Sequence, residues 1–370
     1  MIYLDYAANT LVDDRVLDVF VEATRKYIAN PNSNHYLGLL AKEKIDESSK
    51  YIGDYFKTDK KNVIYTSGSS ESNNLVIKGI AEIRKNKGNK IIISAVEHSS
   101  VVAPCSYLAN LGYDVSVISL DKNGIVNLDE LESEIDDNTI LVSICAVDSE
   151  LGTIQPVERI ADIVKRHPNC VFHTDATQAI GKVNVNYDGV DFITFAPHKF
   201  FGLNGFGCLI NRNDIKLIPL IHGGKSTTIY RSGTPVTANV IALKESFKIA
   251  TNELESRKEY ITKLNNKLRS EFKRFDCIHI NSPISAIPNT LNISLINNDT
   301  KEVLKELEDN GIYLSITTAC ALGDMPSKSV LAITGDSNLA ANTIRISLSH
   351  LVTEEDIDKF LSIFDKIINN

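Results

Sequence analysis

Short apolar runs alternate with longer amphipathic stretches from about residue 60 to residue 215. The longer stretches, such as 71–86, 99–111 and 156–167, have the pattern of helices. This alternation indicates β-α-β units, and so an α/β fold whose mostly parallel sheet has helices on both faces. Ligands of such sheets bind at the carboxyl ends of the strands. The apolar runs predicted to be strands lie at 90–95, 114–120, 139–147, 169–174, 190–196 and 205–211.

The pattern changes near residue 250, where a long charged helix is predicted over 252–274. Shorter strands and helices follow, which is typical of a smaller α+β domain. We expect a large domain over residues 15–250 and a small domain built from residues 1–14 and 251–370. The elements predicted in the second region are strands at 290–295, 312–316 and 343–348 and helices at 300–310 and 353–368.

The composition is that of a soluble globular protein. A chain of 370 residues exceeds one ordinary hydrophobic core, and 43% of its residues are hydrophobic and 23% charged. No stretch approaches the roughly 18–20 apolar residues of a membrane span. The residues after Met1 lack the basic and apolar regions of a secretory signal. We therefore expect a cytoplasmic protein without a membrane partner.

Charge and cysteine content narrow the function further. The net charge is -8 and the basic residues are dispersed, which argues against nucleic acid as a partner but allows a local anion pocket. The six cysteines include no C-x-x-C pair, so we predict no metal site and no disulfide framework. Cys145 and Cys208 lie in apolar runs and are interpreted as small buried side chains. Cys320 lies in a segment of loop composition, which makes it a candidate reactive thiol.

An acid and a lysine follow two successive strands of the predicted sheet. Asp175 directly follows the apolar run 169–174. Lys199 follows the run 190–196, just ahead of a glycine-rich turn. Taken singly, Asp175 could be a helix cap and Lys199 a solvated surface residue. Together they are the pair that a pyridoxal-phosphate site requires, a carboxylate for the pyridine nitrogen and a lysine for the Schiff base.

Small hydroxyl residues stand where another helix is predicted to begin. The segment 66–74 contains five hydroxyl residues and Gly68 after an apolar run, so it could cradle an anion with backbone N–H groups and the helix dipole. An ordinary serine cap is the alternative. His98 also follows a strand and could stack on a planar ring and relay protons, although a lone histidine is more often structural.

Two arginines in the second half of the chain are candidates for binding anions. Arg345 lies in the middle of an apolar strand, where its guanidinium group suits the α-carboxylate of a substrate. An internal salt bridge is the alternative interpretation. Arg231 lies beside a glycine turn, together with the hydroxyl group of Thr234.

With these residues assembled, the chain resembles the class V (fold type I) pyridoxal-phosphate enzymes, and among them the NifS/IscS-type cysteine desulfurases. The likeness covers nearly the whole chain, and its motifs are specific in their order and spacing. The matching segments are Tyr3–Thr10, Asn30–His35, Thr66–Gly68, Glu71–Asn74, Glu97–His98, Glu150–Pro156, Asp175–Gln178, His198–Lys199, Arg231–Thr234, Ala319–Cys320 with Pro326–Ser327, and Ile344–Arg345.

The resemblance implies pyridoxal phosphate as the cofactor. Lys199 would form the Schiff base, Asp175 would hold the pyridine nitrogen, Gln178 would bond the ring hydroxyl and His98 would stack on the ring. Thr234 would reach the phosphate from the partner subunit of a homodimer. The residues implied at the cofactor are Ser69, Ser70, His98, Asp148, Asp175, Gln178, His198, Lys199 and Thr234.

The resemblance also implies the reaction, with Lys199, Cys320 and His98 as catalytic residues. L-cysteine, held by Arg345 and Asn30, would become L-alanine, and its sulfur would pass to Cys320 as a persulfide for an acceptor protein that the sequence does not name. A selenocysteine lyase, another β-eliminating lyase of this cofactor, and a non-catalytic paralogue are the alternatives.

The chain departs from the family pattern at several positions near the site. Asp148 and Ser149 replace a pair of asparagines, and Ala196 replaces a serine that binds phosphate. Losing that hydroxyl should weaken phosphate binding by about 1 kcal/mol. Ser349 and His350 stand where glycine and arginine are usual.

Overall fold

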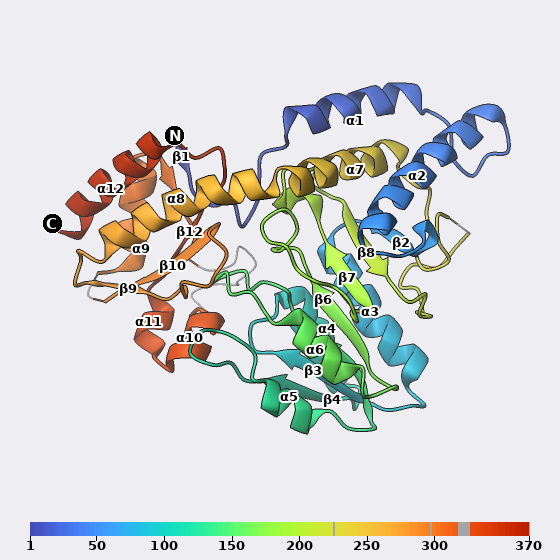
Figure 1. Cartoon of the computed structure of the whole chain (residues 1–370), viewed down its shortest axis with the longest axis horizontal. Coiled ribbons are helices and arrows are strands. Elements are labelled where there is room, and N and C mark those ends of the chain that lie inside the picture. The colour runs from blue at the N-terminus through green and yellow to red at the C-terminus, as the bar shows by residue number, and fades with distance from the viewer. Residues whose placement is uncertain (225, 297, 317–325, 370) are drawn as a thin grey trace.

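The computed structural model describes residues 1–224, 226–296, 298–316 and 326–369 (Figure 1). Its largest element is a seven-stranded sheet in which β8 runs antiparallel to both of its neighbours and the remaining pairs are parallel. The predicted α/β class and mostly parallel sheet are therefore confirmed. In spatial order the strands are β2 (Val63–Thr66), β8 (Gly207–Asn211), β7 (Phe192–Phe195), β6 (Val171–Asp175), β5 (Thr139–Ser143), β3 (Lys90–Ser94) and β4 (Asp114–Ile118).

Helices cover both faces of this sheet. Leu141 and Val142 are adjacent in β5 but belong to different clusters of buried side chains, because neighbouring residues of a strand point to opposite faces. Leu75 packs in the cluster of Leu141, and Ile160 packs in the cluster of Val142. The helices of this part are α1 (Asp14–Lys26), α2 (Tyr36–Tyr55), α3 (Ser69–Arg84), α4 (Ser99–Ala109), α5 (Leu128–Glu134), α6 (Val157–Val164) and α7 (Thr237–Asn252).

A smaller antiparallel sheet lies at the other end of the molecule, and the long helix α8 (Leu254–Phe272) runs between the two parts (Figure 1). A separate cluster of buried side chains joins this sheet to α8 and α12. The strands are β12 (Thr343–Ser347), β10 (Thr290–Leu295) and β9 (Ile278–Ile280), and the other helices are α9 (Thr300–Asp309), α10 (Lys328–Thr334), α11 (Ser337–Ala341) and α12 (Glu354–Ile368).

The amino-terminal residues are built into this smaller part. β1 (Ile2–Tyr3) pairs in parallel with β11 (Ile312–Tyr313), and Leu4 lies in the same buried cluster as Phe360. The chain then continues toward the large sheet, where the backbone N–H of Thr10 donates to the carbonyl of His198. The segment from Leu4 to Thr10 therefore connects the two sheets. Among the described residues, no helix has the length and apolar character needed to cross a bilayer.

Candidate active site

The segments that follow five strands of the large sheet surround one cavity of about 320 Å³. This volume is typical of a site for a small ligand. The surrounding segments follow the carboxyl ends of β2, β3, β5, β6 and β7, the edge at which parallel sheets bind ligands. The sequence-predicted residues that line this cavity are Ser69, Ser70, His98, Asp175, Gln178, His198, Lys199 and Arg345.

Asp175 is the last residue of β6, and its carboxylate accepts two hydrogen bonds. The side-chain amide of Asn73 donates to Oδ2 at 2.7 Å, and the backbone N–H of Thr177 donates to Oδ1 at 2.9 Å. Asn73 is fully buried in α3 and also donates to Oγ of Ser100 at 2.9 Å. These donors hold the carboxylate in one orientation at the wall of the cavity.

His98 is the N-cap residue of α4, and its Nδ1 accepts the backbone N–H of Ser100 at 3.1 Å. Because an imidazole nitrogen that accepts a hydrogen bond carries no proton, the proton of the neutral ring is on Nε2. Burial lowers the pKa of His98, an effect that the carboxylate of Asp175 partly opposes. The ring at the cavity is therefore neutral at neutral pH.

Lys199 lies in the short helix η2 (Pro197–Lys199), directly after β7. Its Nζ donates to the carbonyl of Ala7 at 2.9 Å and to that of Ala8 at 2.5 Å. Both alanines belong to the amino-terminal segment that connects the two sheets. Asp175 and Lys199 therefore line one cavity from neighbouring strands, β6 and β7, with the amino-terminal segment beside the lysine.

The hydroxyl cluster stands at the amino terminus of α3, which begins at Ser69. Gly68 is the N-cap residue and has no side chain to bond the N–H groups of the first turn. Such N–H groups, together with the helix dipole, bind anions. Ser67, Gly68, Ser69 and Ser70 all line the cavity, so this end of it is suited to a phosphate group.

Arg345 reaches the cavity from β12, and only 1% of its surface is exposed. Its Nη2 pairs with Oδ1 of Asp5 at 3.0 Å, and its Nη1 donates to the carbonyl of Ser149 at 3.1 Å. Among the described residues, its Nε has no hydrogen-bond partner. The internal salt bridge considered as an alternative is thus present, and Arg345 nevertheless lines the cavity.

Gln178 and His198 complete the wall. Nε2 of Gln178 donates to the carbonyl of Ala7 at 3.0 Å, and its Oε1 accepts from Nζ of Lys182. Burial lowers the pKa of Lys182 to about 7, and the positive charges of Lys199 and Arg345 act in the same direction. Burial also lowers the pKa of His198 to about 4, so this imidazole is neutral as well.

Three residues predicted at the site do not line the cavity. The carboxylate of Asp148 accepts from the backbone of Leu151 at 2.6 Å and from Oγ of Ser329 at 3.1 Å, and Ser149 faces the cavity in its place. Asn30 is exposed, and its Oδ1 accepts from the backbone of Asn32.

Thr234 is the third of these residues. It lines a neighbouring hollow of about 130 Å³ that shares Ser67 with the cavity. In that hollow, Arg231 pairs with Glu71 at 3.0 Å. Cys320, the predicted nucleophile, lies outside the described residues, whereas Cys145 lines the cavity with a thiol whose pKa burial raises well above its usual value.

A mostly parallel α/β fold, with a lysine and an acid at the ends of neighbouring strands, is that of a pyridoxal-phosphate enzyme. The chain matches the aminotransferase class V family over residues 2–360 and belongs to that family, whose members depend on pyridoxal phosphate. Within it, the chain is a homologue of cysteine desulfurases over its full length.

Three relatives support this placement. The cysteine desulfurase IscS of Dictyoglomus turgidum is 34% identical over 372 residues, which cover 99% of this chain and 94% of the relative. The structure of a NifS-like protein superposes with a TM-score of 0.93 at 34% identity, covering 100% of this chain and 99% of the other. The structure of SspA in complex with cysteine has a TM-score of 0.83 at 30% identity, covering 94% of this chain and 99% of the other.

Proposed function

We propose that the protein is a pyridoxal-phosphate-dependent cysteine desulfurase that converts L-cysteine to L-alanine and takes up the sulfur on Cys320. The observation that carries this proposal is the meeting of Lys199 and Asp175 in one cavity. Membership of the family and full-length similarity to cysteine desulfurases support it. The acceptor protein that would receive the sulfur is outside this proposal.

The residues around the cavity fit the cofactor. The amino terminus of α3 offers N–H groups and the hydroxyls of Ser69 and Ser70 to a phosphate. Asp175 offers a carboxylate, held by two donors, to a protonated ring nitrogen. Gln178 has an amide N–H for the ring hydroxyl, and the neutral His98 can lie against a flat ring. Lys199 supplies the amine that joins the cofactor.

Bound pyridoxal phosphate supplies an electron sink that stabilises negative charge at the substrate Cα. The chain's own residues then bind the substrate and move its protons. Arg345 would hold the α-carboxylate in the place of one of its present partners, Asp5 or the carbonyl of Ser149. Nζ of Lys199 is the base at the cavity that can take a proton from Cα and return it. The protonated Nε2 of His98 can donate toward the substrate.

The sulfur step follows from the chemistry of the thiol. The thiolate of Cys320 attacks the substrate sulfur, the bond from that sulfur to Cβ breaks, and its electron pair stays with the carbon fragment. Protonation of that fragment gives alanine. L-cysteine and the Cys320 thiol are thus converted to L-alanine and a Cys320 persulfide, without a further oxidant or reductant.

Incubation of the pure enzyme with L-cysteine tests the proposal directly. We expect one alanine per sulfur transferred and a mass increase of one sulfur on the peptide that contains Cys320, measured by mass spectrometry. Cys320→Ser should keep the visible band of the bound cofactor and form no persulfide. Lys199→Ala should lose that band, because it removes the amine that joins the cofactor.

The outcomes separate the parts of this proposal. A pure protein that has no visible band after incubation with pyridoxal phosphate would exclude the cofactor assignment. Unchanged alanine and sulfide yields in Cys320→Ser would exclude Cys320 as the nucleophile. A parallel incubation with L-selenocysteine measures the selectivity, and preferential release of selenium would favour a selenocysteine lyase.

A further inference from the structure

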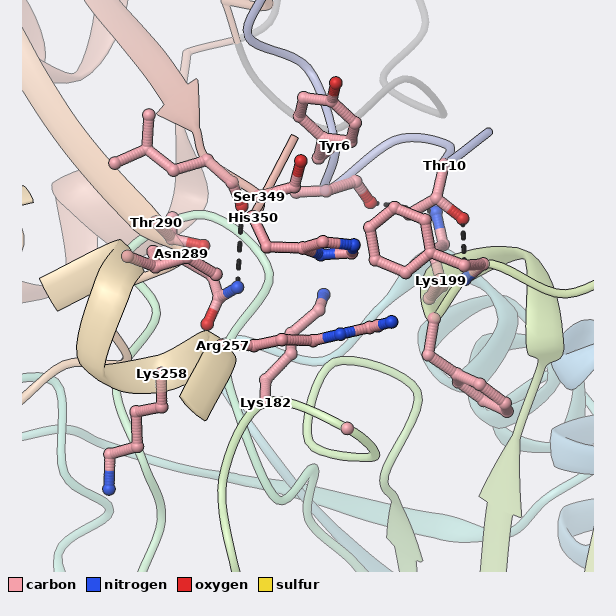
Figure 2. Close-up of a pocket in the computed structure, with 16 residues that line it drawn as sticks. Tyr6, Thr10, Lys182, Lys199, Arg257, Lys258, Asn289, Thr290, Ser349 and His350 are labelled. Atoms are coloured by element: carbon pink, nitrogen blue, oxygen red, sulfur yellow. Dashed lines mark hydrogen bonds between the residues drawn. The ribbon is translucent and has the colours of Figure 1, made fainter. Parts of the chain in front are cut away.

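A buried lysine that the reaction above does not use lies directly behind the cavity wall. Lys182 is 8% exposed, and its Nζ donates to Oε1 of Gln178. Figure 2 shows its ammonium group pointing into a second, small cavity of about 20 Å³, beside Arg257 and His350. Lys182 lines this second cavity and not the larger one, so it does not touch a ligand bound in the larger one.

The surroundings of Lys182 contain positive groups and no carboxylate that pairs with it. Arg257 lines the same small cavity, beside His350, whose imidazole is neutral because burial lowers its pKa to about 4. The charges of Lys199 and Arg345 lower the pKa of Lys182, and the charge of Lys182 lowers that of His198. Among the described residues, Lys182 makes no ion pair. A buried lysine in such surroundings costs free energy of folding. Stabilisation of the fold therefore does not explain it.

The two neighbours of Gln178 settle which way its amide group points. The ammonium group of protonated Lys182 can only donate, and it lies at the oxygen end of the amide. The carbonyl of Ala7 can only accept, and it lies at the nitrogen end, 3.0 Å from Nε2. If the amide rotated by half a turn, a donor would face a donor and an acceptor would face an acceptor. Both hydrogen bonds would be lost.

This orientation decides what Gln178 offers to the larger cavity. An amide nitrogen carries two hydrogens, and one of those on Nε2 is donated to Ala7. The second is available to an oxygen in the cavity, which Gln178 lines. The cation at Oε1 polarises the amide and makes that N–H a stronger donor. A ring hydroxylate is the kind of acceptor that such a donor stabilises.

We propose that Lys182 is a positioning residue, which fixes and polarises the amide of Gln178 so that it donates a hydrogen bond to the ring hydroxyl of the cofactor. This inference rests on the proposed function, because it takes the ligand of the larger cavity to be pyridoxal phosphate. It adds a residue behind the cavity wall that tunes the cofactor without touching it.

The experiment uses the loaded enzyme and reads its visible spectrum as a function of pH. Lys182→Met keeps the length of the side chain and removes the charge and the donor. A strong donor to the ring hydroxylate makes the junction of Lys199 and the cofactor easier to deprotonate. Removing the cation weakens the Gln178 donor, so it should raise the pH midpoint of the spectral change by about one unit. Cofactor affinity, measured by equilibrium binding to the apoprotein, should fall about tenfold.

Matched variants separate positioning from a structural effect. Lys182→Arg keeps a cation and a donor, and the adjoining small cavity gives it space, so its midpoint should stay at or below that of the wild type. Lys90→Met removes another buried lysine, which pairs with Glu134 far from the cavity, and should leave the midpoint unchanged. In a Gln178→Ala background, Lys182→Met should shift the midpoint by much less, because the amide that transmits its effect is gone.

The results decide between the two proposals. A wild-type protein without a visible band would overturn the proposed function and this inference with it. A wild-type band whose midpoint is the same in Lys182→Met would overturn the inference alone. An equal shift with and without Gln178 would also overturn it, because Lys182 would then act on the cofactor directly. Thermal unfolding of the apoprotein checks folding, and Lys182→Met should melt no lower than the wild type because it removes a buried charge.

Discussion

Glu97 carries a proton at neutral pH because its carboxyl group is buried. Oε1 accepts from Oγ of Ser94 at 2.6 Å and from the backbone of Cys145 at 2.9 Å, whereas Oε2 has no partner among the described residues. Burial raises the pKa of Glu97 from about 4.5 to about 8, and the nearby carboxylate of Asp175 adds to the effect. The residue before His98 is therefore a neutral acid.

The stability of the protein should depend on the pH through this residue. An acid with a higher pKa in the folded chain than in the unfolded chain stabilises the folded state fully below pH 4.5, and this contribution is lost as the pH rises to about 8. Glu97→Gln keeps the acceptor oxygen and cannot ionise. Between pH 4.5 and pH 8, we expect the free energy of unfolding of this variant to fall by about 2–4 kcal/mol less than that of the wild type.

Urea denaturation of the apoprotein at several pH values measures this difference. The wild type and Glu97→Gln should be closest in stability near pH 4.5 and diverge toward pH 8. Parallel profiles for the two proteins over the whole interval would contradict the prediction, because they would mean that Glu97 ionises as readily in the folded chain as in the unfolded one.

Residue patterns predicted some members of the site and missed others for a physical reason. Lys199 and Asp175 directly follow strands, and the position of a strand end can be read from the sequence. Asn73 supports Asp175 from a helix 102 residues earlier in the chain. Lys182 supports Gln178 from behind the wall, and no local pattern distinguishes it from a surface lysine. A buried polar residue on an otherwise apolar helix face was the available signal for Asn73.

At the scale of elements, the start of α3 is held close to the start of β8. Gly207 opens β8, and a Cβ atom there would lie 2.4 Å from the carbonyl carbon of Gly68, the N-cap residue of α3. Gly207 pairs with Thr66 across the strands that precede this turn. The absence of a side chain at Gly207 therefore allows the anion-binding end of α3 to approach the sheet.

Gly207→Ala should displace this turn. We expect the free energy of unfolding of the apoprotein to fall by about 1–3 kcal/mol, because backbone atoms must move to admit the methyl group. Gly68→Ala is the control, since a Cβ there meets nothing within 4 Å and its φ of 162° is open to any residue. Equal stability of Gly207→Ala and the wild type in urea denaturation would refute the close approach.

Element prediction succeeded where the hydrophobic pattern was clean. The strands β3 to β8 lie within the predicted apolar runs or one residue beyond them, and α8 and α12 lie inside the predicted helices. α1 and α2 were not predicted. α2 exposes apolar residues such as Leu37 and Leu39, which blur its amphipathic pattern, whereas α1 is clearly amphipathic and was missed although its pattern was available. β11 has two residues where five were predicted, since the chain leaves the pairing with β1 after Tyr313.

At the scale of the whole molecule, the position of Thr234 bears on the homodimer that the family resemblance implies. This residue lines the neighbouring hollow rather than the cavity, although the family resemblance gives it a role at the phosphate. Exposed apolar side chains such as Leu37, Leu39 and Val236 are suited to burial against a second copy of the chain. The division into a large and a small domain likewise remains a proposal, which the separate buried clusters support.

Mixing two inactive or weakened variants tests whether Thr234 acts on the partner's site. Thr234→Ala should weaken cofactor binding, and Lys199→Ala should abolish alanine formation. A mixed dimer would contain one complete site, with Lys199 from the first variant and Thr234 from the second. We expect alanine formation at limiting cofactor to exceed that of either variant alone. Mixing with a Lys199→Ala, Thr234→Ala double variant is the control, and equal rates in the two mixtures would place Thr234 on its own subunit's site.

The connection between Asp5 and Arg345 has a consequence for biosynthesis. The two side chains are 340 positions apart, and the segment that includes Asp5 also supplies the carbonyls that Lys199 contacts. During translation the amino-terminal residues emerge first, but their partner strand is made last. The ribosome must therefore release almost the entire polypeptide before the catalytic pocket can close, so a nascent chain that stalls before β12 cannot assemble a finished pocket.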